Sequence, residues 1–285
     1  MANTRELRRR IRSVKNTSQI TRAMQMVAAV KMKKAQDQAV SGRPYSENLS
    51  VALTRLLPRV DVEAHPLLVE NESSKVGVIL LSTDKGLVGS LNTNIMRAVL
   101  SFQINHVIFY TVGKKGRNFV VRTGKELVAD FENVDAVTFR QAVQLAKLVI
   151  ESFKAGEVGE IYLIYPQFVS TLKQEPKTVK LLPISLEVSL EVSKEGKVST
   201  SEFLFEPNVD TLLDSLLVHH IQIRIYQALL ETRASEHSSR MVAMKNATDN
   251  ALELVEDLTL TYNQVRQDSI TREILEISTA TAAME

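Results

Sequence analysis

The C-terminal end of the chain decides its fold; residues 231–285 read ETRASEHSSRMVAMKNATDNALELVEDLTLTYNQVRQDSITREILEISTATAAME. This stretch, and the residues before it back to position 208, contain neither glycine nor proline, the two residue types that most often interrupt regular structure. The 78 residues 208–285 therefore predict one nearly unbroken helix, roughly 117 Å long at ~1.5 Å per residue. A helix of that length is typical of a coiled coil or a helical repeat.

The N-terminal end has the same property. Residues 1–41 also contain no glycine or proline, because all ten glycines lie between Gly42 and Gly196 and all seven prolines between Pro44 and Pro207. A second long helix is therefore expected at the N-terminus, ending at the latest where Pro58 breaks it.

Both terminal segments carry a seam with the spacing of a coiled coil. In the N-terminal segment the seam residues are Leu7, Ile11, Val14, Ser18, Thr21, Gln25, Ala28, Met32, Ala35 and Ala39. In the C-terminal segment they are Met244, Ala247, Ala251, Leu254 and Leu258, followed after a one-residue slip by Tyr262 and Val265. The seam is rich in small and weakly polar residues, which favours a close approach of the two helices.

The charges indicate that these two helices pair with each other. Residues 1–34 hold ten cationic side chains and one anionic one, whereas residues 231–285 hold five cationic and ten anionic ones. Because opposite charges attract, we expect the two terminal helices to pack on each other. The N-terminal helix keeps an excess of positive charge, which calls for an acidic partner.

The middle of the chain has a different pattern. Short runs rich in Val, Ile and Tyr predict strands at Val76–Thr83, Val107–Val112, Ile161–Phe168 and Val179–Ile184. Helical patterns at about 90–104 and 138–154 separate them, which indicates an α/β layer with a mainly parallel sheet. The predicted division is a coiled-coil helix over 1–57, a linker over 58–75, an α/β domain over 76–206 and a coiled-coil helix over 207–285. A polar segment between Glu187 and Lys197 is expected to be a loop or an edge hairpin.

Composition excludes several classes of protein. The chain has 285 residues and a net charge of +2, and it contains no cysteine, which removes disulfides and thiolate chemistry. Its apolar runs are far shorter than the ~20 residues that span a bilayer. The basic N-terminus lacks the apolar stretch of a secretory signal.

A search for catalytic residues is mostly negative, and we predict no catalytic, cofactor-binding or metal-ligating residues. Neither of the common glycine-rich phosphate loops is present, and the Gly113–Gly116 segment is interpreted as a plain turn rather than a phosphate cradle. His219 and His220 are adjacent on a helix and point ~100° apart, which is poor for joint metal ligation. The Ser82-Thr83-Asp84 segment is expected to cap the next helix, with a contact role as the alternative.

The basic N-terminal helix has three possible interpretations. It could be a solvated charged face, a nucleic-acid-binding surface, or a surface that docks against acidic loops of a partner protein. The apolar seam on the same helix and the lack of interleaved aromatic residues argue against nucleic acid.

Three long motifs resemble the gamma-subunit family of the rotary F-type ATP synthase. They are IRSVKNTSQITRAMQMVAA at 11–29, TDKGLVGSLN at 83–92, and ASEH with RMVAMKNATDN at 234–250. The pairs Tyr262-Asn263 and Arg266-Gln267, followed by ITREI at 270–274, are also similar to that family.

The resemblance implies a fold, a function and partners. The expected fold is α/β with a long antiparallel coiled coil, in which the N- and C-terminal helices pack on each other beside a Rossmann-like central domain. The expected function is that of a rotor shaft without a nucleotide site of its own. The shaft would turn inside the alpha–beta hexamer, contact the epsilon subunit and the ring of c subunits, and couple ion flow to ATP synthesis. The expected location is the cytoplasmic face of a bacterial membrane, as a peripheral protein.

The resemblance also implies particular residues. The expected contacts with the beta subunit are Arg8, Arg9, Met24, Lys85, Arg240, Arg266 and Gln267. The expected bearing tip comprises Ser278, Thr279, Ala280 and Ala282, where Ser278-Thr279 replaces a glycine pair common in the family. The chain lacks the cysteine-containing insertion of the chloroplast form and any transit peptide, which favours a bacterial source.

Two further expectations concern the length of the C-terminal helix and an alternative function. Since the C-terminal helix is about 20 residues longer than its partner, residues from about Tyr262 to Glu285 should project as a single helix. The alternative function is that of a nucleic-acid-binding coiled coil with an α/β core.

Overall fold

The computed structural model describes residues 4–56, 65–102, 106–134, 136–184 and 209–282. It divides into two compact units, one formed by Met1–Ala29 with Arg240–Glu285 and the other by Val30–Ser239. We call them the coiled-coil unit and the sheet unit. Two helices belong to both units: α1 (Thr4–Leu56) and α6 (Val209–Ala282).

The two long helices confirm the interpretation of the glycine and proline positions. The α6 helix runs without a break over 74 residues, and α1 over 53. Pro44 lies inside α1 but does not end it. The predicted break at Pro58 and the polar segment between Glu187 and Lys197 fall outside the described residues.

In the coiled-coil unit, α1 and α6 are antiparallel. The hydroxyl groups of Thr21 and Thr248 are 2.7 Å apart and buried, and Arg8 Nη2 donates to Tyr262 Oη at 2.6 Å nearer the end of α1. Leu7, Ser18 and Ala28 are buried in this unit, which confirms the predicted seam of α1.

The predicted seam of α6 is largely confirmed, since Met244, Ala251, Leu258, Tyr262 and Val265 are buried or half-buried, but it is wrong around Leu254 and omits Thr248. Thr248 is buried with 6% exposure, whereas Leu254 is 41% exposed and Val255 takes its place. The contact with Thr21 explains the difference, because a hydroxyl pair rather than an apolar pair occupies this layer. With Thr248 in the seam, the spacing runs from Met244 to Val265 without the one-residue slip.

The sheet unit holds five strands in the order β3-β2-β1-β4-β5. These are β1 (Val76–Leu81), β2 (Val107–Val112), β3 (Glu126–Phe131), β4 (Glu160–Phe168) and β5 (Gln174–Leu182). Pairing is parallel from β3 through β4, and β5 is antiparallel to β4, so the mainly parallel sheet is confirmed.

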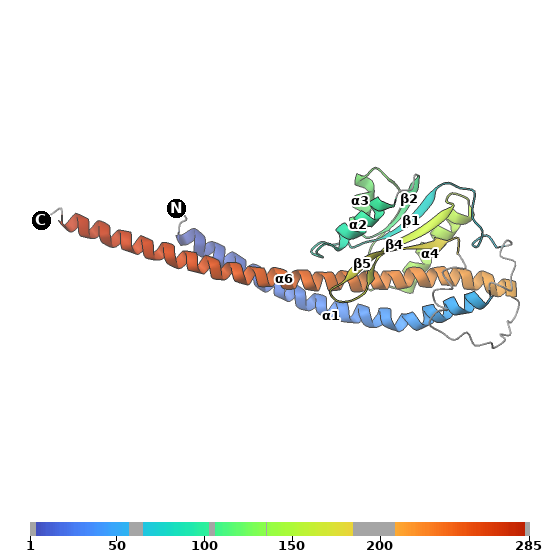
Figure 1. The fold of residues 1–285 in the computed structure, drawn as a ribbon, viewed down its shortest axis with the longest axis horizontal. Helices are drawn as coiled ribbons and strands as arrows, with labels where there is room; N and C mark the ends of the chain where they lie inside the picture. Colours follow the sequence, from blue (N-terminus) through green and yellow to red (C-terminus); the bar gives the residue numbers. More distant parts are fainter. Residues whose placement is uncertain (1–3, 57–64, 103–105, 135, 185–208, 283–285) are drawn as a thin grey trace. The chain divides into compact units, whose positions relative to one another are not determined.

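Helices lie on both faces of this sheet (Figure 1), and a hydrophobic core fills the space on each face. Val78 and Leu80 of β1 pack with α2 (Leu91–Ser101) and α3 (Lys114–Arg122). Ile79 and Leu81, which alternate with them, pack with α4 (Phe139–Lys154) and with the N-terminal half of α6. The sheet is thus buried on both faces, as parallel sheets generally are.

Three expectations for this unit are corrected. The strand β3 was not predicted, because its residues alternate between exposed and half-buried at the edge of the sheet. The Gly113–Gly116 segment is not a plain turn but the start of α3. The predicted strand Val179–Ile184 begins earlier, at Gln174.

Candidate functional site

The outer surface of the coiled-coil unit is the first candidate site. Between Arg5 and Lys15, the arginine and lysine side chains of α1 are exposed, and Arg9 is one of them. Arg8 lies over the ring of Tyr262 at 5.5 Å from the ring centroid, as well as donating to its hydroxyl group. A basic surface therefore extends to the end of α1, and one of its arginines is held in place by α6.

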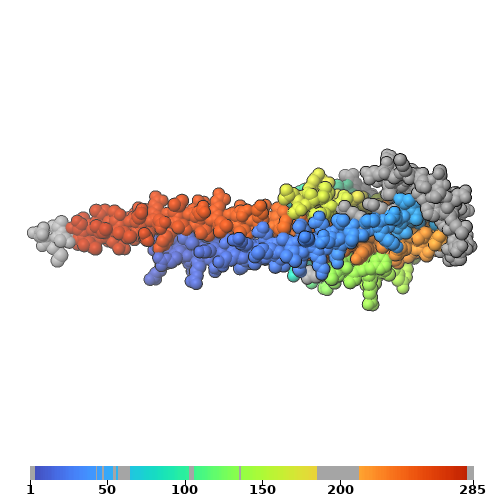
Figure 2. Space-filling view, turned by 90° about the horizontal axis from the view of Figure 1, so that it is seen from below, coloured from blue at the N-terminus to red at the C-terminus, as the bar shows by residue number. Residues whose placement is uncertain are grey.

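The predicted projection of α6 is confirmed, but it begins a few residues later than expected. Tyr262 and Val265 are still half-buried, whereas every residue from Arg266 to Ala280 is exposed. Figure 2 shows α6 (orange to red) continuing beyond the blue end of α1. Residues 266–280 therefore form a single helical stretch that no other described helix covers, and we call them the projecting segment.

The projecting segment carries two more of the predicted contact residues and most of the predicted tip. Arg266 and Gln267 are exposed at its base, and Ser278, Thr279 and Ala280 are exposed near its end. The Thr279 hydroxyl group donates to the carbonyl oxygen of Leu275 at 2.9 Å, so it is satisfied within the helix. Ala282 is the last residue of α6, and its side chain is outside the described part of the chain.

Large apolar side chains are also exposed on the projecting segment. Ile270, Ile274, Leu275 and Ile277 have exposed fractions between 47% and 68%. Exposed apolar side chains gathered on one short stretch of a helix are typical of a surface that another protein covers. Ile270 and Ile274 belong to a family motif of the sequence, but the motif did not predict that these apolar side chains form an exposed surface.

Met24 and Arg240 also belong to the coiled-coil unit, and both are half-buried. Lys85 belongs instead to the sheet unit, in the turn after β1, where its side chain is exposed. Thr83 Oγ1 donates to the carbonyl oxygen of Lys85 at 2.8 Å and exchanges hydrogen bonds with Asn92. The turn that presents Lys85 is thus fixed by side chains of the predicted 83–92 motif.

The same turn caps a helix, but not the helix that was expected. Ser90 precedes α2 without a capping hydrogen bond from its side chain. Asp84 Oδ1 instead accepts from the amide of Lys114 at 2.8 Å, and Ser82 Oγ accepts from the amide of Gly116 at 2.8 Å. Ser82 and Asp84 therefore cap α3, which occupies the amides that a phosphate cradle would have used.

A Cβ atom on Gly113 would lie 2.4 Å from the carbonyl oxygen of Ser82, and Gly113 has a φ of +100°. Only glycine fits this close approach of β1 and α3 without strain.

The carboxyl ends of the parallel strands are the usual ligand-binding position of such sheets, where the strand order reverses. Here the loop after β3 and part of α6 occupy that position. Asn133 Nδ2 donates to the carbonyl oxygen of Ser82 at 2.9 Å, just after β1, and Ser235 Oγ donates to that of Pro166 in β4 at 3.0 Å. Ser238 Oγ donates to the carbonyl oxygen of Thr171 at 2.6 Å.

A buried ion pair lies at the centre of this contact. Arg233 Nη1 and Glu236 Oε2 are 2.8 Å apart, with exposed side-chain fractions of 5% and 4%. Arg233 Nη2 donates to the carbonyl oxygen of Asn133, and Asn133 Nδ2 also reaches Glu236 Oε2 at 3.5 Å. We call Arg233, Glu236 and Asn133 the junction. Sequence reasoning missed it; the signal was two charged residues one helical turn apart beside the small residues Ala234 and Ser235.

Three shifted pKa values have structural causes. Burial, with the nearby charges of Arg224 and His219, lowers the pKa of His220 to about 3, so this side chain is neutral inside the core. Burial and the neighbouring Glu160 raise the pKa of Tyr162 to about 12. A hydrogen bond from Lys180, on the adjacent strand β5, lowers the pKa of Glu160 despite its partial burial.

Two searches of the described residues gave negative results. No group of three or more His, Asp or Glu side chains there is arranged to hold a metal ion. None of the described helices has an apolar stretch of the length that a membrane span requires.

Comparison with known proteins identifies the family. A family model described as ATP synthase matches residues 3–284. The chain is 46% identical over its full length to the ATP synthase gamma chain of Methylacidiphilum infernorum, and the match covers all of that relative as well. The chain belongs to the ATP synthase gamma chain family. The gamma chain of Desulfitobacterium hafniense is 41% identical, again over the full length of both chains.

Solved structures agree with this family. A chain from the central stalk and c-ring of the Tetrahymena thermophila mitochondrial ATP synthase has a TM-score of 0.63 at 28% identity, over 80% of this chain and 99% of that one. A chain from the Euglena gracilis mitochondrial ATP synthase has a TM-score of 0.68 at 21% identity, over 99% and 94%, which shows the shared fold. The gamma-chain resemblance predicted from three motifs is confirmed, and the nucleic-acid-binding alternative receives no support.

Proposed function

We propose that this gamma-family chain is the rotor shaft of an F-type ATP synthase. The shaft couples ion-driven rotation of the membrane ring of c subunits to ATP synthesis, and in reverse to ATP hydrolysis, in the alpha–beta hexamer. The chain itself is not catalytic, and nucleotides bind to its partners. The observation that carries this proposal is the projecting segment.

The projecting segment needs a protein around it. A lone helix of this length is marginal in water, and the four exposed apolar side chains at 270–277 gain free energy when they are covered. A sleeve formed by alpha and beta subunits would supply that cover. The absence of charged side chains from Ile277 to Ala283 suits rotation, because no ion pair has to break at each step.

The basic surface of α1 fits the same arrangement. Arg8 and Arg9 would meet acidic loops of the beta subunit, as would Met24 and Arg240 further along the coiled coil. Arg266 and Gln267 would hydrogen-bond a beta loop at the base of the projecting segment. Lys85 would make a contact from the sheet unit, and Ser278, Thr279, Ala280 and Ala282 would form the bearing tip.

The remaining proposals concern the foot of the shaft and its place in the cell. The epsilon subunit and the ring of c subunits would contact the central domain, here taken as 76–206, and the coiled-coil segments 1–57 and 207–285 beside it. The chain would then be a peripheral protein on the cytoplasmic face of a bacterial membrane.

A rotation experiment tests this function. Because the chain contains no cysteine, Asn118→Cys on the exposed side of α3 provides a single attachment site for a bead. In a complex immobilised through its hexamer, we expect ATP to drive the bead in one direction, while a bead attached to a beta subunit stays still. ATP hydrolysis with a stationary bead on Asn118→Cys would contradict a rotor role. Purification of the chain with nucleic acid instead of the hexamer would favour the rejected alternative.

A further inference from the structure

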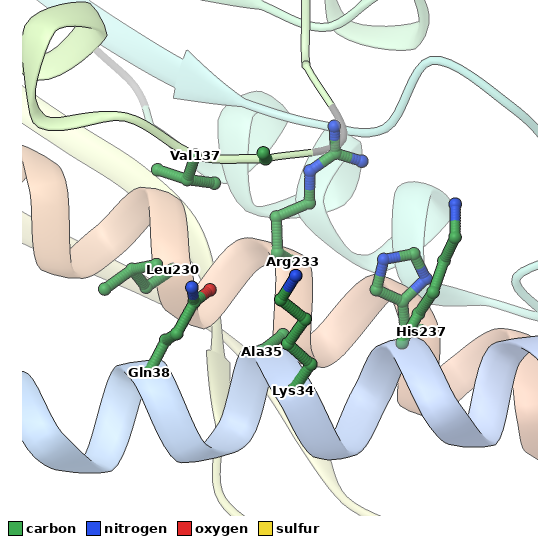
Figure 3. Close-up of a pocket in the computed structure, with 9 residues that line it drawn as sticks. Lys34, Ala35, Gln38, Val137, Leu230, Arg233 and His237 are labelled. Atoms are coloured by element: carbon green, nitrogen blue, oxygen red, sulfur yellow. The ribbon is translucent and has the colours of Figure 1, made fainter.

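A pocket of about 260 Å³ lies in the sheet unit, between α1, α6 and the loop that follows β3 (Figure 3). Four of its nine lining residues have basic side chains: Lys31, Lys34, Arg233 and His237. The other five are neutral, and none of the nine is Asp or Glu. The described wall of the pocket is therefore basic, although the chain as a whole has a net charge of only +2.

Both helices contribute to the pocket with the same spacing. Lys31, Lys34 and Gln38 lie on one face of α1, and Leu230, Arg233 and His237 lie on one face of α6. In Figure 3, Lys34 and Gln38 extend from α1 toward α6. The polar lining residues thus all lie on regular helices, which fixes the positions of the donors, while the loop contributes only Ala136 and Val137.

Arg233 provides a rigid cationic group in the wall. Its Nη1 is bound to Glu236 and its Nη2 to the carbonyl oxygen of Asn133, while its buried Nε has no hydrogen-bond partner among the described residues. Because Glu236 offsets the charge of Arg233, the exposed ammonium group of Lys34 supplies the positive charge that this wall offers to an anion. The apolar side chains of Ala35, Val137 and Leu230 lower the local dielectric, which strengthens the attraction of an anion.

We propose that this pocket binds a small phosphate-type oxyanion, with inorganic phosphate or pyrophosphate as the class of ligand. An ammonium group offers three donors and pairs with phosphate as a point charge. The pocket is smaller than the usual ~300–1,000 Å³ of sites for drug-sized ligands, which suits a compact anion. The inference rests on the sheet unit alone and does not depend on the proposed rotor function.

The test compares lysines on the same helix. We would titrate the full chain with inorganic phosphate, and separately with pyrophosphate, at constant ionic strength, and follow the ³¹P linewidth. Saturable binding is expected for the parent chain. Lys34→Gln should weaken binding by about tenfold, since it removes one charge-assisted hydrogen bond. Lys33→Gln is the matched control, because Lys33 is an exposed neighbour that does not line the pocket, and it should leave affinity within about twofold.

Two results would overturn the proposal. The first is a ³¹P linewidth change that does not saturate as phosphate is added. The second is an equal loss of affinity in Lys33→Gln and Lys34→Gln. The second result would mean that the basic helix attracts anions in general. A circular dichroism melt of each variant checks that the fold is intact. A second measurement uses the assembled complex: its structure in phosphate buffer should show tetrahedral density beside Lys34. An acidic side chain of a partner subunit in that position would refute the phosphate assignment.

Discussion

The junction gives the sharpest prediction about stability. In Glu236→Ala, Arg233 keeps its charge but loses the carboxylate that lies 2.8 Å away. Both side chains are at least nine-tenths buried, so water cannot replace the lost partner. Removing one member of a buried ion pair costs about 3–5 kcal/mol. We therefore expect the free energy of unfolding to fall by about that amount.

A double variant separates charge burial from packing. Arg233→Met with Glu236→Leu removes both charges and retains apolar volume. Its remaining cost comes mainly from the carbonyl oxygen of Asn133, which loses its donor. An unsatisfied buried acceptor costs about 1–3 kcal/mol, so the double variant should be more stable than Glu236→Ala.

Urea unfolding followed by circular dichroism at 222 nm measures these differences. The matched control is Glu151→Ala, whose partner Lys147 lies 3.8 Å away and where the two side chains are 73% and 62% exposed. That pair should contribute about 0.5 kcal/mol or less. A cost of Glu236→Ala as small as that of the control would refute the reasoning, and so would a double variant less stable than the single one.

Three further predictions concern the pH dependence of stability, the rotation rate of the assembled complex and the stability of the chain without its projecting segment. Because the pKa of His220 is about 3 in the folded chain, the unfolded chain binds the extra proton below pH 6.5. Stability should therefore fall by about 2 kcal/mol from pH 7 to pH 5, and His220→Gln should remove that part of the fall; an identical pH profile in the variant would contradict it. Arg266→Ala with Gln267→Ala should slow ATP-driven rotation of the assembled complex while leaving its helix content unchanged, and parental rotation rates would show that these side chains make no coupling contact. Deleting residues 266–285 should change the melting temperature of the isolated chain by no more than a few degrees from that of the parent, because residues 266–280 are all exposed. A large fall in the melting temperature would mean that the segment is part of the folded core.

Several features were predictable from the sequence because they depend on short-range chemistry. The absence of glycine and proline from residues 1–41 and 208–285 predicted both long helices, although α1 continues past Gly42 and Pro44 to Leu56. The seam of α1 followed from its 4-3 spacing alone. The strand Val107–Val112 was predicted with the bounds that the structure gives, because it is a buried run of β-branched and aromatic residues.

The elements that were missed depend on neighbours distant in sequence. Thr248 enters the seam because Thr21 faces it from the other helix, whereas apolar character alone favours the neighbouring Ala247. The α3 helix begins at Lys114 because Ser82 and Asp84, more than 25 residues earlier, bind its first amides. The edge strand β3 lacks a continuous apolar run because only one of its sides pairs with another strand.

Two long helices and an α/β layer could be predicted from the sequence, and its motifs indicated the gamma-chain family. Both predictions were possible because periodicity and motif order are properties of the linear chain. The contact of Arg233 and Glu236 with the carboxyl ends of the sheet could be seen only in the folded chain. The same is true of the position of Lys34 in the wall of a basic pocket. Burial and partnership of charged side chains depend on which surfaces meet, and that information does not lie in any single segment.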